Sequence, residues 1–304
     1  MTAQQVKPNS MKAWFLAIRP KTLTGAAAPV LVGGALAYHY IKMGVGIEGR
    51  NMWIPFCLAL AFAMLMQITA NMVNDYFDFK KGSDREDRLG PERACAQGWI
   101  SPEKMRRAVI AMSLLSLIIG APLVMYGGWE MLLVGVACVL FCWLYTTHLS
   151  YLGLGDLLVI VFFGLVPVAF TFYVMTGCMT TDAWVAGLAM GLCTDCLLLV
   201  NNYRDIDQDR ESGKRTLVVR VGRRWGLWLY LCCGIMAAVC MASVMKIWTL
   251  ALIPYLALHL TTYFAMTRKT GRELNHVLGA TARNIFIFGI IIAAVFCGLH
   301  LLNH

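Results

Sequence analysis

Long apolar runs alternate with short polar segments along the whole chain. A helix needs ~20 apolar residues to cross the hydrocarbon core of a bilayer, and most of these runs reach about that length. We therefore expect an all-α membrane protein with about nine transmembrane helices, the first of them kinked at Pro29. The expected helices cover residues 12–40, 52–78, 105–126, 131–147, 157–175, 182–205, 225–245, 247–267 and 281–302.

The second apolar run ends in a polar stretch, NMVNDYFDFKKGSD, from Asn71 to Asp84. Asn71, Asp75 and Asp78 are spaced by four and three residues, and Asn74 also lies four residues before Asp78. If the helix continues through them, these side chains share one face. Acidic side chains at a membrane helix end are costly to dehydrate, so we expect them to face a polar cavity.

A second stretch, NNYRDIDQDRESGKRT, repeats this arrangement at the end of the sixth expected helix. Here Asn202, Asp205 and Asp209 are again spaced by three and four residues. Both stretches follow even-numbered helices, which places them on the same side of the membrane. Two polar-acidic helix ends on one membrane face, each followed by a basic loop that contains glycine, indicate a shared site. The alternative is that both are simple interfacial caps.

The composition supports a membrane protein: 59% of the residues are hydrophobic and only 14% are charged, against about 25% charged in soluble proteins. We expect one polytopic domain over residues 1–304, with a polar N-terminal arm at 1–11 and cytoplasmic active-site loops at 79–104 and 206–224. No cleavable signal peptide is evident, so we expect the first apolar segment to be retained.

The net charge of +9 reports topology before it reports a ligand. Of the 26 Lys and Arg residues, 23 fall within residues 7–21, 80–107, 204–224 and 268–283, near the N-terminus and around the ends of the second, sixth and eighth expected helices. Basic residues concentrate in cytoplasmic loops, which predicts a cytoplasmic N-terminus and, with nine crossings, an external C-terminus. This distribution argues against nucleic acid as a partner.

Carboxylate and amide oxygens on two facing helix ends suit Mg²⁺, which binds a few carboxylates together with phosphate oxygens and water. The absence of a nearby His or Cys in the two stretches argues against zinc. A diphosphate is the natural partner, because Mg²⁺ and basic side chains neutralise it. A site that opens from the bilayer favours a lipid diphosphate, whose ionisation gives an allylic cation that aromatic faces stabilise. Candidate aromatic residues are Tyr145, Phe162, Phe163 and Tyr203.

Two further features have structural alternatives. Asp195 lies seven residues before Asn202, about 10 Å deeper on the same helix face, as a possible deep polar group or a structural acid. Cys193 and Cys196 form a CxxC within an apolar run, without a second pair, so we expect no disulfide or metal there.

The motifs together resemble the intramembrane aromatic prenyltransferases, and within them the branch that prenylates 1,4-dihydroxy-2-naphthoate in menaquinone biosynthesis. The resemblance covers nearly the whole chain. It rests on RPKTL at 19–23, NDYFDFKKGSDREDRLGPER, YLGLGDLLVIVFFG at 151–164 and, most specifically, RDIDQDRESGKRTLVVRVG. The wider superfamily's NDxxDxxxD pattern has an acid where Gly82 stands, whereas the naphthoate branch resembles this sequence, with Asp84 supplying the later carboxylate.

The resemblance implies a bundle around a central cavity in a bacterial inner membrane. It implies Mg²⁺ (two ions bridging the diphosphate), a polyprenyl diphosphate donor and 1,4-dihydroxy-2-naphthoate as acceptor, with CO₂ lost and demethylmenaquinone formed after oxidation. The implied metal ligands are Asn74, Asp75, Asp78, Asp84, Asn202, Asp205 and Asp209, with Asp78, Asp205 and Asp209 catalytic. The implied diphosphate contacts are Arg19, Lys81, Arg88, Lys214 and Arg215.

Three alternatives stay open on the sequence alone. The acceptor could be 4-hydroxybenzoate or homogentisate. A cation-coupled transporter would place its acids in broken helices near the midplane, which only Asp195 fits. A CDP-alcohol phosphotransferase would carry a DG-x₂-AR pattern, which the sequence lacks.

Overall fold

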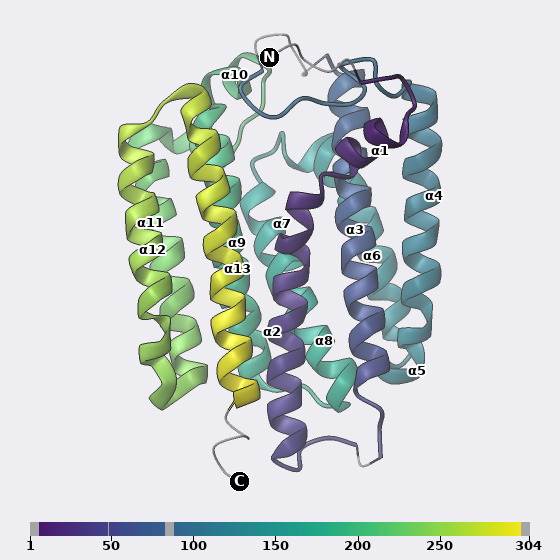
Figure 1. The fold of residues 1–304 in the computed structure, drawn as a ribbon, viewed down its shortest axis with the longest axis vertical. Coiled ribbons are helices and arrows are strands. Elements are labelled where there is room, and N and C mark those ends of the chain that lie inside the picture. Colours follow the sequence, from purple (N-terminus) through teal and green to yellow (C-terminus); the bar gives the residue numbers. More distant parts are fainter. Residues whose placement is uncertain (1–5, 48, 83–87, 299–304) are drawn as a thin grey trace.

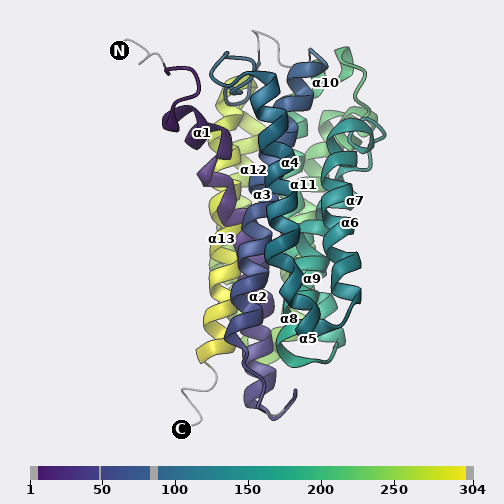
Figure 2. The ribbon, with the colours of Figure 1, turned by 90° about the vertical axis from the view of Figure 1, so that its right-hand side faces the viewer.

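The computed structural model describes residues 6–47, 49–82 and 88–298, and in these ranges the chain forms helices and no strand. The long helices run side by side in one bundle (Figure 1, Figure 2). The expected all-α membrane fold is confirmed. In chain order the elements are α1 (Met11–Ile18), η1 (Pro20–Thr22), α2 (Leu23–Lys42), α3 (Trp53–Lys80), α4 (Pro102–Gly120), η2 (Ala121–Leu123), α5 (Val124–Gly127), α6 (Glu130–Leu144), η3 (Tyr145–Leu149), α7 (Gly155–Ile160), η4 (Val161–Leu165), α8 (Val166–Thr176), α9 (Thr181–Arg204), α10 (Ile206–Glu211), α11 (Leu217–Met245), η5 (Lys246–Leu252), α12 (Ile253–Arg268), η6 (Gly271–Glu273) and α13 (Leu274–Gly298).

Seven helical ranges of the described chain are long and apolar enough to cross a membrane. One of the seven, 217–268, contains two helices, α11 and α12, joined by η5. α2 is not among the seven, but its 20 residues pack beside α13 within the bundle. The described residues therefore hold about nine bundle helices, as the apolar runs predict. α1 and α10 lie at one end of the bundle and the last turn of α13 lies at the other (Figure 1).

The first expected helix is two helices rather than one. α1 ends where Arg19 adopts a left-handed conformation (φ 55°) directly before Pro20, and a residue before proline disfavours the helical region. Asn71 of α3 donates from Nδ2 to the Ile18 carbonyl and to Thr22 Oγ1, both at 2.8 Å, and so ties the break to the bundle. The predicted boundary at this helix is wrong for that local reason.

Other boundaries shift by local backbone chemistry. α11 adds a short first segment from Leu217, capped by Thr216, and the non-helical Gly222 (φ 83°) separates this segment from the long helix that begins close to the expected 225. The ninth begins at Leu274 instead of 281, and its expected end at 302 lies outside the described residues. The fourth and fifth expected helices contain the π-helical segments η3 and η4.

α9 is the central helix, and 67% of its apolar membrane-spanning stretch is buried inside the protein. It approaches η4 through glycines: a Cβ on Gly164 would lie 2.3 Å from the Gly191 Cα and 2.5 Å from the Gly187 carbonyl oxygen. Small residues at such positions let membrane helices approach closely. This contact fixes α9, and with it the second acidic stretch, against the segment that carries Phe162 and Phe163.

We expect Gly164→Ala to destabilise the protein by about 1–3 kcal/mol, because the added methyl group meets backbone that cannot move away. Thermal unfolding in detergent should show a Tm several degrees lower. Gly279→Ala in α13 is the matched control, since no atom lies within 4 Å of a Cβ there, and it should leave the Tm unchanged or raise it slightly. Equal Tm values for the two variants would contradict close packing at Gly164.

Candidate active site

The two acidic helix ends line one polar cavity of about 140 Å³ at the α10 end of the bundle. α3 supplies Asn74 and Asp78 to its wall, and the junction of α9 and α10 supplies Asn202, Asp205 and Asp209. The predicted meeting of the two stretches is therefore seen in the structure. α9 ends at Arg204 and Asp205 turns the chain into α10, so these three residues face one cavity without belonging to one continuous helix.

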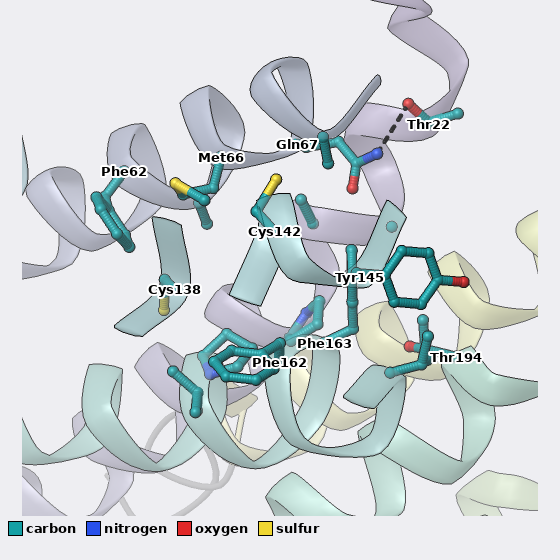
Figure 3. A pocket seen from close by; sticks show the side chains of 18 of the residues that line it. Thr22, Phe62, Met66, Gln67, Cys138, Cys142, Tyr145, Phe162, Phe163 and Thr194 are labelled. Atoms are coloured by element: carbon teal, nitrogen blue, oxygen red, sulfur yellow. Dashed lines mark hydrogen bonds between the residues drawn. The ribbon is translucent and has the colours of Figure 1, made fainter. Parts of the chain in front are cut away.

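A larger, mainly apolar cavity of about 910 Å³ lies among the membrane helices next to the polar one. Figure 3 shows part of its wall, with Phe62 and Met66 of α3 facing Phe162 and Phe163 of η4 across the space. The two cavities adjoin, because seven residues line both: Asn74, Arg88, Arg93, Tyr145, Thr146, Leu198 and Asn201.

Asp78 forms a buried ion pair with Arg93. An Arg93 Nη2 donates to Asp78 Oδ2 at 2.7 Å, and both side chains are less than 10% exposed. Leaving either charge buried alone would cost several kcal/mol. Arg93, which lines both cavities, therefore holds the Asp78 carboxylate in the wall of the polar one.

Asp75 is on the same helix but performs a different structural task. Its two carboxylate oxygens accept hydrogen bonds from the backbone N–H groups of Ala94 (2.8 Å) and Cys95 (2.9 Å). It is 1% exposed and lines neither cavity. It fixes the turn that carries Arg93, and its predicted metal contact would require it to give up these bonds.

On the α9 side, Arg204 binds the Asp205 carboxylate through Nε at 2.7 Å and Nη2 at 2.6 Å. Asp209 lies 4.0 Å from Lys214. Burial raises the pKa of Asp209 to about 6; Lys214 lowers that pKa, and the carboxylates of Asp205 and Asp78 raise it. The carboxylates of Asp205 and Asp78 thus disfavour the ionisation of Asp209, and a bound cation would offset their combined charge.

The predicted basic contacts divide into two groups. Lys214 and Arg88 line the polar cavity, and Arg19 lines the apolar one with a buried Nη2 that has no hydrogen-bond partner. Lys81 and Arg215 line neither cavity. Lys81 donates to the carbonyls of Thr146 (3.2 Å) and Thr147 (2.6 Å).

The ring of Tyr151 joins the loops of the two halves. The ammonium of Lys81 lies 3.9 Å from its centroid and that of Lys214 lies 5.6 Å away. The Tyr151 carbonyl also accepts from the backbone N–H of Arg215 at 3.2 Å. Lys81 and Arg215 thus contact the loop that borders the cavity rather than the cavity itself.

Other predicted positions also separate. Tyr145, Phe162 and Phe163 line the apolar cavity, whereas Tyr203 packs in a different cluster under the Arg223 guanidinium. Asp195 is 2% exposed and lines neither cavity; its Oδ2 lies 3.9 Å from Cys233 Sγ of α11. Asp84 lies outside the described residues.

The polar cavity fits Mg²⁺ by donor chemistry. Its described lining offers Asn and Asp oxygens, which are the ligands that Mg²⁺ prefers. It offers no His or Cys, the side chains that commonly bind zinc. Within the described ranges, no three His, Cys, Asp or Glu side chains form a preassembled metal cluster. Asp78 and Asp205 are instead each paired with an arginine, so oxygens supplied by a ligand and by water would complete the coordination.

Sequence reasoning missed several residues of the cavity walls. Arg204, which the sequence shows only as one of several basic residues near the second acidic stretch, lines the apolar cavity and binds Asp205. Asn201, whose Oδ1 accepts from Arg204 at 2.7 Å, lines both cavities. Asp156 lines the polar cavity from α7. Its signal was available, since it is an acid at the start of an otherwise apolar run.

Comparison with known proteins gives one family. Residues 26–290 match the UbiA prenyltransferase family. The chain is 36% identical over 251 residues to the 1,4-dihydroxy-2-naphthoate octaprenyltransferase of Escherichia coli (strain K12), covering 80% of this chain and 78% of that protein. It is 32% identical over 300 residues to the protein of the same name from Mycobacterium tuberculosis, covering 93% of this chain and 96% of the other.

Solved structures share the fold at low sequence identity. A UbiA homolog from Aeropyrum pernix K1 superposes with a TM-score of 0.68 at 17% identity, covering 90% of this chain and 98% of that one. A UbiA homolog from Archaeoglobus fulgidus, solved with GPP and Mg²⁺, gives a TM-score of 0.62 at 15% identity and covers 93% and 99% of the two chains.

Proposed function

We propose, from the premise that this chain belongs to the UbiA prenyltransferase family, that it transfers a polyprenyl group from a polyprenyl diphosphate to 1,4-dihydroxy-2-naphthoate. CO₂ is lost, and demethylmenaquinone forms after oxidation. The relatives named for this reaction are up to 36% identical over most of the chain. The observation that carries the proposal is that a polar cavity lined by both acidic helix ends adjoins a large apolar cavity.

The two cavities divide the donor between them. The prenyl tail occupies the apolar cavity, where Phe62, Met66 and Phe162 offer apolar contact, and the diphosphate occupies the polar one. The bond that breaks, between the prenyl C1 and the diphosphate oxygen, then lies at the shared wall near Tyr145 and Asn74. The rings of Tyr145, Phe162 and Phe163 present π faces to the allylic cation as it develops.

The metal ligands in this proposal are Asn74, Asp78, Asn202, Asp205 and Asp209, with Asp75 and Asp84 as further predicted ligands. Mg²⁺ held by these residues would neutralise the diphosphate and stabilise its charge as it departs. Support comes from the Asn and Asp oxygens in the lining of the polar cavity and from the UbiA homologs solved with prenyl diphosphates and Mg²⁺. Asp78, Asp205 and Asp209 would be catalytic residues because their carboxylates would hold the metal.

The basic residues bind the diphosphate oxygens that the metal leaves exposed. Lys214 and Arg88 do so from the cavity wall. Arg19 contributes its unpartnered Nη2 from the apolar side. Lys81 and Arg215 are proposed as further contacts; each would have to leave its present place beside the loop at Tyr151.

We further propose a single domain over 1–304, with the arm at 1–11 and the loops at 79–104 and 206–224 at the active-site end, in a bacterial inner membrane. The family match spans most of the chain. The distribution of Lys and Arg supports a cytoplasmic N-terminus and an external C-terminus, and α1 lies at the opposite bundle end from the last turn of α13.

The proposed activity is tested in membranes that contain the expressed protein, with polyprenyl diphosphate, 1,4-dihydroxy-2-naphthoate and Mg²⁺. A prenylated naphthoquinone is expected, and none after chelation of the metal. Supplying 4-hydroxybenzoate and homogentisate at equal concentration should leave the naphthoate product dominant. A dominant product from either competitor would reassign the acceptor, and no prenylated product from any of the three would reject the proposed function.

Mg²⁺ and a polyprenyl thiodiphosphate are expected to stabilise the protein more together than the two do separately, because each offsets the charge of the other in the polar cavity. A ligand at 100 times its Kd adds about 2.7 kcal/mol to the free energy of unfolding, which thermal unfolding in detergent detects. Polyprenyl alcohol, which lacks the diphosphate, is the control and should add no Mg²⁺-dependent shift. Strictly additive shifts would contradict a shared site.

A further inference from the structure

Asp156 is a buried carboxylate that the proposed chemistry leaves unused. It is the second residue of α7 and is 8% exposed. Both of its carboxylate oxygens are buried without a hydrogen-bond partner, although the residue lines the polar cavity. A buried polar group without a partner is costly, so a ligand that supplies one would be bound selectively at this point.

The position of α7 brings Asp156 to the boundary between the two cavities. α7 lies between the π-helical segments η3 and η4, and such segments occur often at functional sites. Tyr145 of η3 lines both cavities, and its hydroxyl lies 3.5 Å from the position of a Cβ on Gly155.

A second unpartnered polar atom lies on the same side. Thr194 of α9 is 5% exposed, lines the apolar cavity and has a buried Oγ1 without a hydrogen-bond partner. Figure 3 shows its side chain at the Tyr145 end of that cavity. Leu198, one turn further along α9, lines both cavities and lies 3.4 Å from a Cβ placed on Gly155. Asp156 and Thr194 thus flank the point where Tyr145 and Leu198 join the cavities.

We propose that Asp156 and Thr194 form the subsite for the 1-hydroxyl group of the naphthoate acceptor, an assignment that rests on the proposed function. Asp156 accepts the hydroxyl proton, and Thr194 donates to the hydroxyl oxygen. This hydroxyl is on the carbon next to the carbon that reacts, so its electron pair feeds the new bond. In the free acceptor it bonds to the neighbouring carboxylate, which must turn out of the ring plane before CO₂ can leave.

The proposed reaction balances its bonds and its protons without any further reagent. The bond between the prenyl C1 and the diphosphate oxygen breaks, and its electron pair leaves with the diphosphate. The ring carbon that bears the carboxylate forms the new C–C bond to the prenyl C1. The proton of the acceptor's 1-hydroxyl group moves to Asp156 as the bond between this oxygen and its ring carbon gains carbonyl character. The bond to the carboxylate then breaks, its electron pair restores the aromatic ring, CO₂ departs, and Asp156 returns the proton to the oxygen.

The test compares two redox-stable ligands, 1-hydroxy-2-naphthoate and 2-naphthoate, which differ only in this hydroxyl. Their affinities are measured on the full chain in nanodiscs with Mg²⁺ and polyprenyl thiodiphosphate present. We expect the wild type to bind the hydroxylated ligand about 10-fold more tightly, as a hydrogen bond to a charged group gives. In Asp156→Asn this preference should fall below about threefold, with the thiodiphosphate affinity unchanged.

Asp195→Asn is the matched control, because Asp195 is a buried acid that lines neither cavity; it should keep the wild-type preference. Thr194→Val, nearly isosteric, should reduce the preference about threefold and provides the test if Asp156→Asn does not fold. An unchanged preference in the folded variants would overturn the proposal. So would an equal loss of thiodiphosphate affinity in Asp156→Asn, which would assign Asp156 to the metal–diphosphate site.

The kinetic readout separates this proposal from the proposed function. In Asp156→Asn, kcat/KM for dihydroxynaphthoate should fall at least about 100-fold, while KM for the prenyl diphosphate stays within about threefold. A wild type that binds both ligands with the expected preference but makes no product would reject the activity and leave the hydroxyl subsite supported. An active wild type without the preference would reject the subsite alone.

Discussion

Asp78→Asn is expected to reduce prenyl transfer by roughly 10³-fold, as loss of a group that stabilises departing charge does. The Asn amide has the shape of the Asp78 carboxylate. Its oxygen can still accept the hydrogen bond that Arg93 Nη2 donates to Asp78 at 2.7 Å in the wild type. The protein should therefore fold, while the charge that holds the metal is lost. Initial rates at saturating Mg²⁺ measure the effect, and thermal unfolding reports the fold.

Asp78→Ala separates the two tasks of this residue. It leaves the buried Arg93 guanidinium without its carboxylate, which costs about 3–5 kcal/mol, so both Tm and activity should fall. A fully active Asp78→Asn variant would show that the charge of Asp78 takes no part in the reaction. Arg93→Lys, which keeps the charge but changes the geometry, should retain partial activity.

Three Asp residues occupy every second position from 205 to 209 in the second acidic stretch. We expect their replacement by Asn to change the reaction rate to very different extents. Asp205→Asn and Asp209→Asn should each reduce the rate by roughly 10²–10³-fold, because both residues line the polar cavity. Asp207→Asn should stay within about twofold of the wild type: the Asp207 side chain is 69% exposed and pairs with Arg223 outside the cavity. The variants are compared in one assay of initial rate against Mg²⁺ concentration.

Asp207 is the matched control because it has the same side chain and lies in the same short helix, α10, as Asp209. If Asp207→Asn were as inactive as its neighbours, the effect would reflect the charge or the folding of α10 rather than the cavity. If Asp205→Asn and Asp209→Asn were active, the α9 side would have no role in binding the diphosphate.

The sequence predicts the large features because they follow from strong physical constraints. Apolar runs of membrane length have to be helices, and acids at their ends have to face something polar. This reasoning brings Asp78 and Asp205 to one membrane face, and the structure places both on one cavity wall.

The finer assignments depend on where loops return, which spacing does not encode. Asp75 and Asp78 are one helical turn apart, yet Asp75 meets the backbone at Ala94 and Asp78 meets the Arg93 side chain. Lys81 and Lys214 read alike as basic loop residues, but only Lys214 lines the polar cavity. Asp156 is visible in the sequence only as an acid at the start of an apolar run; its place in the wall of the polar cavity depends on the two π-helical segments on either side of α7.

The placement of the polar cavity at the α1 and α10 end of the bundle also separates the fates of the products. Inorganic pyrophosphate is strongly hydrated and diffuses into the aqueous compartment on that side, whereas the isoprenoid quinol stays in the hydrocarbon core of the membrane. The two products therefore depart by different routes. A water-soluble hydrolase confined to that one compartment would drive the transfer forward without ever touching lipid.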